Sequence, residues 1–291
     1  MADERFSLKL ASDVAFYLDE AKVPNLLFGW LAMSLVGSRK VSTEVDFVIP
    51  DNKMPAAIKT LAETANYPVC KDPNCNELHF DRVRGYTADQ SLVLSPNRIH
   101  SVAAAHFHLE DGTFILNLHP QSKLLWWLPE LTTAAPAAED PYLMLSTDPR
   151  LPPLSVKPAL EGVAPTGGPG PCSANLYHPV KILNPGSLTE ALLTLLCRDR
   201  ARQAMGESEE ADHLAMLWTL MSSQLYDSCG TSISKHVRPK FKEAWDGLNE
   251  RDPGMTNVFN AVRALRDRMA LANELGPLVD GSKYTPPDDF L

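Results

Sequence analysis

The stretch "GSRKVSTEVDFVIPDNK", residues 37–53, decides the fold. Glu44 and Asp46 stand two positions apart in a run with the character of a strand, and apolar residues alternate with them, at Val45, Phe47 and Ile49. Because residues i and i+2 of a strand point to the same side, the two carboxylates share one face. That face either holds a metal ion or meets water.

The composition is that of an ordinary globular protein, with 291 residues, 44% of them hydrophobic and 22% charged. This length suffices for one large domain or two modest ones. We expect no membrane segment, since no run approaches the roughly 18–20 apolar residues of a span, and no secretory signal in "MADERFSLKL". The net charge of −9 disfavours a general nucleic-acid binder, which carries a basic face. Five scattered cysteines indicate reduced thiols and a cytoplasmic location.

The first part of the chain, residues 1–128, predicts an α+β domain with a small mixed sheet. Hydrophobic periodicity indicates a helix, a short helix, a strand, a helix and a cysteine-bearing loop, in that order, at 6–21, 29–36, 44–49, 53–65 and 68–77. The run "RIHSVAAAHFHLEDGTFILNLHP" then predicts a hairpin that turns at Asp111-Gly112.

A proline-rich connection over residues 129–186 and a helical domain over 187–291 complete the predicted organisation. The connection holds twelve prolines, which block helix continuation. It is either a linker or a loop packed over the cleft, since "PYLMLS" and "LPPLSV" are apolar. The last part predicts four helices in a bundle against the first domain, and Ser187 with Glu190 forms a capping box that opens the first helix.

Paired carboxylates on one strand face suit a divalent cation that also holds a triphosphate. Magnesium prefers oxygen ligands and takes one or two carboxylates together with phosphate oxygens. Gly29 stands at the start of the short helix, where a glycine lets phosphates approach backbone amides. Arg39 and Lys40 lie between Gly29 and Glu44 and can neutralise a phosphate.

These residues also carry a family resemblance. The stretch "LLFGWLAMSLVGSRKVSTEVDFVIP" resembles the signature of the nucleotidyltransferase superfamily, the DNA polymerase β-like fold. Gly29 matches its glycine, and Thr43-Glu44-Val45-Asp46 matches its acidic core. The sequence is similar to minimal nucleotidyltransferases and to uncharacterised fungal proteins of the superfamily, in which an arginine-bearing helix follows the catalytic domain. The resemblance implies a magnesium ion on Glu44 and Asp46, and a nucleoside triphosphate or another small molecule as substrate.

Two positions depart from the family pattern. Trp30 replaces a small residue beside the glycine, and its indole cannot cradle a phosphate but can stack on a flat ligand. Asn117 stands where the family often shows a third carboxylate. A neutral amide is a poor metal ligand and cannot serve as a general base, which weakens the case for nucleophile activation.

The predicted hairpin brings histidines to the same region. His106 lies opposite Asn117 in the expected register, so that His106, His108 and His119 share one face with the amide. If this face belongs to the cleft, its acids and imidazoles form a set suited to proton transfer near neutral pH. The alternative is an ordinary polar sheet surface.

The loop "CKDPNCNELH" places Cys70, Cys75 and His79 within ten residues. Zinc sites use four ligands and tighter cysteine spacing, and the sequence shows no obvious fourth ligand here. A zinc site, a disulfide and ordinary thiols all stay open for this loop.

Two functions compete. The first is a magnesium-dependent nucleotidyltransferase that moves a nucleotidyl group to a small molecule, RNA or protein. The second is the same fold without metal chemistry, as an isomerase- or cyclase-type enzyme of secondary-metabolite chemistry or a ligand-binding protein, using the acids and histidines. Fold alone does not separate them. In both cases we expect Glu44 and Asp46 to point into the largest cleft, with Asn117 on the neighbouring strand.

Overall fold

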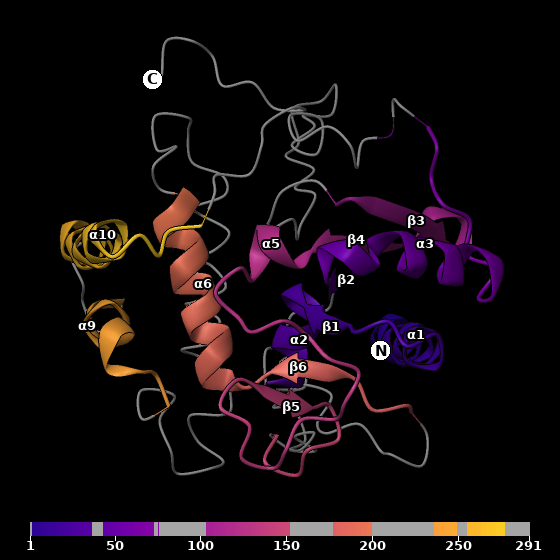
Figure 1. Cartoon of the computed structure of the whole chain (residues 1–291), viewed down its shortest axis with the longest axis horizontal. Helices are drawn as coiled ribbons and strands as arrows, with labels where there is room; N and C mark the ends of the chain where they lie inside the picture. Colours follow the sequence, from indigo (N-terminus) through magenta and orange to yellow (C-terminus); the bar gives the residue numbers. More distant parts are fainter. Residues whose placement is uncertain are drawn as a thin grey trace, which may run out of the picture.

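The fold is α+β, as predicted, with helices packed on a six-stranded mixed sheet (Figure 1). The structure is a computed structural model, and it describes these residues: 2–36, 43–72, 75, 103–151, 177–199, 236–248 and 255–276. In Figure 1 the strands succeed one another from β3 at the top to β5 at the bottom, with α1 and α3 to the right and α6, α9 and α10 to the left.

The sheet has the strand order β3-β4-β2-β1-β6-β5. Strands β2 and β4 pair in parallel, as do β1 and β6, and the other neighbours are antiparallel. The strands have these bounds: β1 Leu26–Phe28, β2 Glu44–Ile49, β3 Ala105–Leu109, β4 Phe114–Pro120, β5 Leu143–Leu145 and β6 Lys181–Leu183.

The helices and strands predicted for the first part of the chain are confirmed, strand β1 was not predicted, and the loop at 68–77 is only partly described. The strand and the short helix fall where the sequence placed them, and the hairpin has the expected register, with His106 opposite Asn117. The described helices have these bounds: α1 Ala2–Glu20, α2 Gly29–Leu35, α3 Met54–Glu63, α5 Gln121–Leu124, α6 Pro185–Asp199, α9 Pro239–Leu248 and α10 Met255–Leu271. Short 3-10 turns precede α3 and join β3 to β4, at Asp51–Lys53 and Glu110–Gly112.

Strand β2 lies in the interior of the sheet, and all six of its residues are buried. Val45, Phe47 and Ile49 fill the core on one face, where each is fully buried. Glu44 and Asp46 point to the other side. Both edges of β2 are occupied, by β4 along its whole length and by β1 at residues 46–48.

The proline-rich segment contributes two strands to the sheet, β5 and β6, which the sequence did not predict. Lys181 at the start of β6 is buried, and its Nζ lies 3.3 Å from Asp19 Oδ1 on α1. His178 Nε2 lies 2.9 Å from the other oxygen of the same carboxylate. These contacts join the segment before α6 to the first helix. The predicted domain boundaries at 128 and 186 stay predictions.

Helix α6 begins at Pro185, three residues earlier than a cap at Ser187 predicts, and Ser187 is not its cap. Asn184 precedes the helix, and its Oδ1 accepts a hydrogen bond of 2.9 Å from the Ser187 amide, as an N-cap side chain does. Pro185 takes the first helical position, where its missing N–H costs nothing. The predicted partner, Glu190, is used elsewhere.

Glu190 ties α6 to the segment that opens α9. Its carboxylate is 2% exposed, accepts the Arg238 amide at 2.7 Å, and pairs with the Arg238 guanidinium at 2.5 Å. Helices α6, α9 and α10 all contact one another, as a bundle requires. The remaining predicted helix, "ADHLAMLWTLMSSQL", lies outside the described residues.

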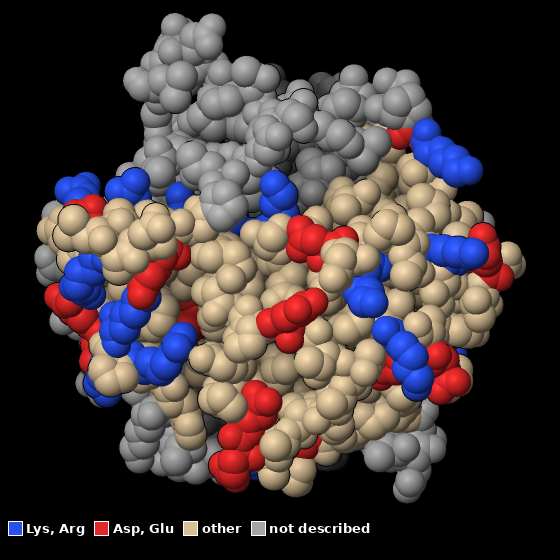
Figure 2. All heavy atoms as spheres, viewed as in Figure 1, with Lys and Arg blue, Asp and Glu red and all other residues tan. Residues whose placement is uncertain are grey.

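The described helices include none long and apolar enough to cross a membrane. On the face shown in Figure 2, basic and acidic side chains are interspersed over the described elements.

Replacing Glu190 by Ala should lower the free energy of unfolding by roughly 1–3 kcal/mol, because it leaves the Arg238 amide and guanidinium without their acceptor. About half of the Arg238 side chain is exposed, which keeps the loss below that of a fully buried pair. Chemical denaturation measures it. Glu63→Ala, at an exposed pair with Lys59, is the control and should change stability by less than about 0.5 kcal/mol. Equal effects of the two substitutions would contradict this prediction.

Candidate active site

The acidic pair lies on β2, in the middle of the sheet. Glu44 is 4% exposed and Asp46 is 1% exposed. They occupy alternate positions of one strand, so their side chains leave the same face, as the sequence predicted. A carboxylate this far from water needs polar partners, because burying an unpaired charge costs several kcal/mol.

Gly29 brings the backbone of the β1–α2 junction against Asp46. Phe28, the last residue of β1, pairs with Asp46 across the sheet, and the chain turns at Gly29 with φ of 72°. A Cβ at position 29 would lie 2.4 Å from Asp46 Oδ2, so a side chain there would collide with the carboxylate. Only glycine combines this backbone conformation with this close approach.

Asn117 and His119 approach Asp46 from β4. Asn117 sits directly opposite Asp46 in the parallel pair, and its Nδ2 donates a 3.0 Å hydrogen bond to Asp46 Oδ1. His119, two positions further on the same face, places Nε2 3.4 Å from the same oxygen. All three side chains are nearly inaccessible to solvent. The amide at position 117 therefore holds the carboxylate in place.

His106 and His108 contact a thiol. They alternate on β3, and their Nε2 atoms lie 3.3 Å and 3.2 Å from Cys75 Sγ. His106 shares a face with Asn117, yet the strand β4 separates it from the acids. The structure thus divides the predicted proton-transfer set. The histidine beside Asp46 is His119, which the sequence placed on the same face as Asn117.

The remaining predicted binding residues are Trp30, Arg39 and Lys40. Trp30 is 3% exposed and packs in the hydrophobic core, so core packing accounts for this residue without a flat ligand. Arg39, Lys40 and His79 lie outside the described residues.

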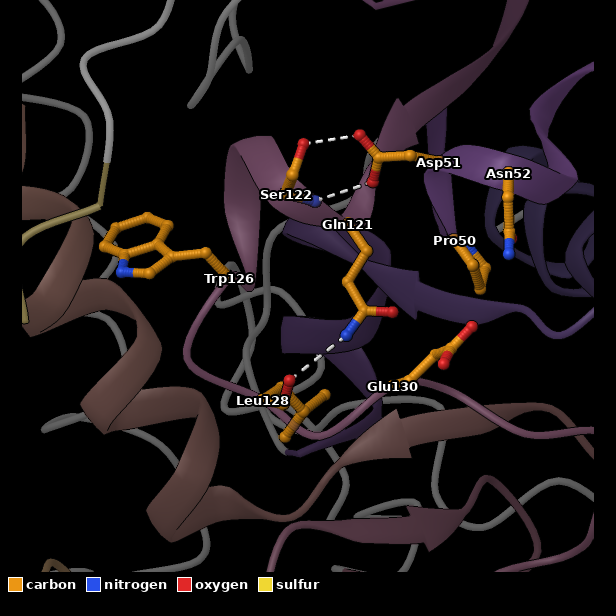
Figure 3. Close-up of a pocket in the computed structure, with 8 residues that line it drawn as sticks. All are labelled: Pro50, Asp51, Asn52, Gln121, Ser122, Trp126, Leu128 and Glu130. Carbon is orange, nitrogen blue, oxygen red and sulfur yellow. Dashed lines mark hydrogen bonds between the residues drawn. The ribbon is translucent and has the colours of Figure 1, made fainter.

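A pocket of about 410 Å³ lies where the parallel strands β2 and β4 end (Figure 3). Glu44 and Asp46 are not among its lining residues, and their expected opening onto the largest cleft stays a prediction. Asp51 and Ser122 lie side by side in its lining, where Asp51 Oδ2 accepts a hydrogen bond of 3.0 Å from the Ser122 amide. The pocket is lined by Pro50, Asp51, Asn52, Gln121, Ser122, Trp126, Leu128 and Glu130.

The sequence matches no protein-family profile, and no curated protein is significantly similar to it. Among solved structures, the chain is similar to the solution structure of the antibiotic-resistance factor ANT(2'')-Ia. The two share 12% sequence identity with a TM-score of 0.36, and the match covers 93% of this chain and 96% of the other. A likeness of this extent is too low to transfer a substrate or an activity.

Gly29→Ala should lower the free energy of unfolding by more than the cost of the backbone conformation alone. A side chain at positive φ costs about 1–2 kcal/mol, and forcing a methyl group against Asp46 adds roughly 1–3 kcal/mol of overpacking. Gly112→Ala is the matched control, because Gly112 has φ of 88° and open space around its would-be Cβ. Chemical denaturation of both variants measures the difference, and an equal loss in the two would show that Asp46 does not press on Gly29.

Proposed function

We propose that the protein is a magnesium-dependent nucleotidyltransferase that moves a nucleotidyl group from a nucleoside triphosphate to a small acceptor molecule. Glu44 and Asp46 hold the metal ion in this proposal. The observation that carries it is the close approach of the Gly29 backbone to the Asp46 carboxylate on a buried interior strand. The sequence resemblance predicts a glycine and two acids that act together, and the fold brings Gly29 and Asp46 into contact.

The donor set fits magnesium. Two carboxylates on one strand face supply the hard oxygen ligands that this ion prefers, and magnesium commonly fills its remaining positions with water and phosphate oxygens. When bound, the ion neutralises charge that develops on the transferring phosphoryl group. The residues of the chain hold and orient these ligands, and the Asn117 amide fixes one oxygen of Asp46.

A second function has its own supporting observation, the 3.4 Å approach of His119 Nε2 to Asp46 Oδ1. A carboxylate that orients an imidazole is a common arrangement for general acid–base catalysis. This contact supports metal-free isomerase- or cyclase-type chemistry on the same face of the sheet. In that case the His119 imidazole transfers the proton, and the Asp46 carboxylate orients the imidazole.

Nucleoside triphosphates should raise the melting temperature of the full chain only when magnesium is present. A ligand at 100 times its Kd stabilises the native state by about 2.7 kcal/mol. This raises the melting temperature by several degrees in a protein of this size. Asp46→Asn should remove the shift. Asp51→Asn, an acid of the neighbouring pocket, should keep it and serves as the control. A shift that persists without magnesium, or survives in Asp46→Asn, contradicts the proposed metal site.

Activity separates the two functions once a turnover assay exists. In a nucleotidyltransferase, Asp46→Asn should remove most activity, and omitting magnesium should have the same effect, since metal-held charge stabilises the transition state by several kcal/mol. In metal-free catalysis, His119→Ala should lower kcat by roughly 10²–10⁴-fold while omission of magnesium changes nothing. His178→Ala is the histidine control, because the His178 imidazole contacts Asp19 on α1.

A further inference from the structure

Four side chains with soft or imidazole donors converge at the edge strand β3. The ligand atoms of Cys70, Cys75, His106 and His108 all lie within 4.8 Å of one another. In a tetrahedral zinc site, bonds of about 2.3 Å to sulfur and 2.0–2.1 Å to nitrogen place the ligand atoms roughly 3.3–3.8 Å apart. The ligand atoms therefore need to approach one another by about 1.5 Å at most to surround one ion.

The backbone of two neighbouring segments brings these four side chains together. His106 and His108 stand at i and i+2 on β3, which puts both imidazoles on one face. The segment after α3 runs beside this strand, where Val69 bridges Phe107 and the Cys70 amide donates a 3.0 Å hydrogen bond to the His106 carbonyl. The Cys75 amide donates a 3.1 Å hydrogen bond to the Asp72 carbonyl, and the Cys75 thiol lies beside both histidines.

The contacts within the cluster favour a shared ion over hydrogen bonding alone. Both Nε2 atoms approach the same sulfur, Cys75 Sγ, at 3.3 Å and 3.2 Å, and the two rings stand edge to face with centroids 5.2 Å apart. Hydrogen bonds can join these groups only two at a time, because each thiol and each neutral imidazole carries one proton. A divalent cation satisfies all four donors at once, with thiolates and neutral imidazoles as its ligands.

We infer that Cys70, Cys75, His106 and His108 together bind one zinc ion. A set of two sulfurs and two nitrogens in tetrahedral arrangement is typical of zinc, and four protein ligands leave no open position for a substrate. The ion is structural: it fastens the segment after α3 to β3, at the end of the sheet seen in Figure 1. It lies two strands away from Asp46, roughly 10 Å, and does not depend on the proposed nucleotidyl transfer.

The test is the zinc content of the purified full-length chain after dialysis, measured by inductively coupled plasma mass spectrometry. The expected result is one zinc per chain. Cobalt exchanged into the site should give the visible bands of tetrahedral cobalt together with thiolate charge transfer. Wild-type protein without zinc that also fails to take up cobalt would overturn the inference, as would a Cys70–Cys75 disulfide found in freshly purified protein.

Variants locate the ion. Cys75→Ser and His108→Ala should each weaken zinc binding at least tenfold in competition with a chromophoric chelator, because changing even the outer partners of zinc ligands costs roughly 10–100-fold. The controls are Cys197→Ala, a buried thiol on α6, and His178→Ala, which should keep one zinc per chain. If a ligand variant does not fold, a mercurial reagent added to the wild type should release the zinc as its thiols react. Zinc retained after full thiol modification, or lost equally in the controls, refutes the assignment.

Discussion

The burial of the Asp46 carboxylate is the constraint on which the centre of the structure depends. An anion that is 1% exposed is stable only where polar groups replace water, and here those groups come from β4. The approach from the other side is possible only because residue 29 is a glycine. Residues at the antiparallel β1–β2 pair and at the parallel β2–β4 pair therefore both contact the Asp46 side chain.

The same face of the sheet carries two chemically different sets of ligands. On β2 the donors are carboxylate oxygens, which magnesium and manganese prefer, whereas beyond β4 they are thiols and imidazoles, which zinc prefers. Asn117 lies between the two sets and pairs with a residue of each. A general chelator would remove both ions, so magnesium dependence is tested by omission of the metal, and zinc dependence by its content in the protein.

Much of the fold followed from local patterns in the sequence. Alternation of apolar residues and acids located β2, and the Asp-Gly turn fixed the β3–β4 register, because both signals are complete within a few residues. Strands β1, β5 and β6 were missed, since each has only three residues near a proline, too few to show periodicity. The start of α6 was misplaced because the Ser187–Glu190 pattern imitates a capping box, while Asn184 and Pro185 set the true boundary.

The candidate sites were predictable only in part, and the reason is distance along the chain. Glu44 and Asp46 are neighbours in sequence, so their common face could be inferred from spacing alone. The partners of Cys70 and Cys75 come from a strand some thirty residues later, and their convergence depends on pairing between Val69 and Phe107. His79, which the sequence places near the thiols, lies outside the described residues, and the two described imidazoles near the thiols belong to the hairpin.

The most direct test of the central claim is the binding of Mn²⁺, an oxygen-preferring substitute for magnesium, followed by its electron paramagnetic resonance signal with and without a nucleoside triphosphate. The account predicts one Mn²⁺ per chain in the presence of the triphosphate, lost in Asp46→Asn and retained in both Asp51→Asn and Cys75→Ser. Binding that is unchanged in Asp46→Asn, or no binding by the wild-type chain, would contradict the assignment of Glu44 and Asp46 as the metal ligands.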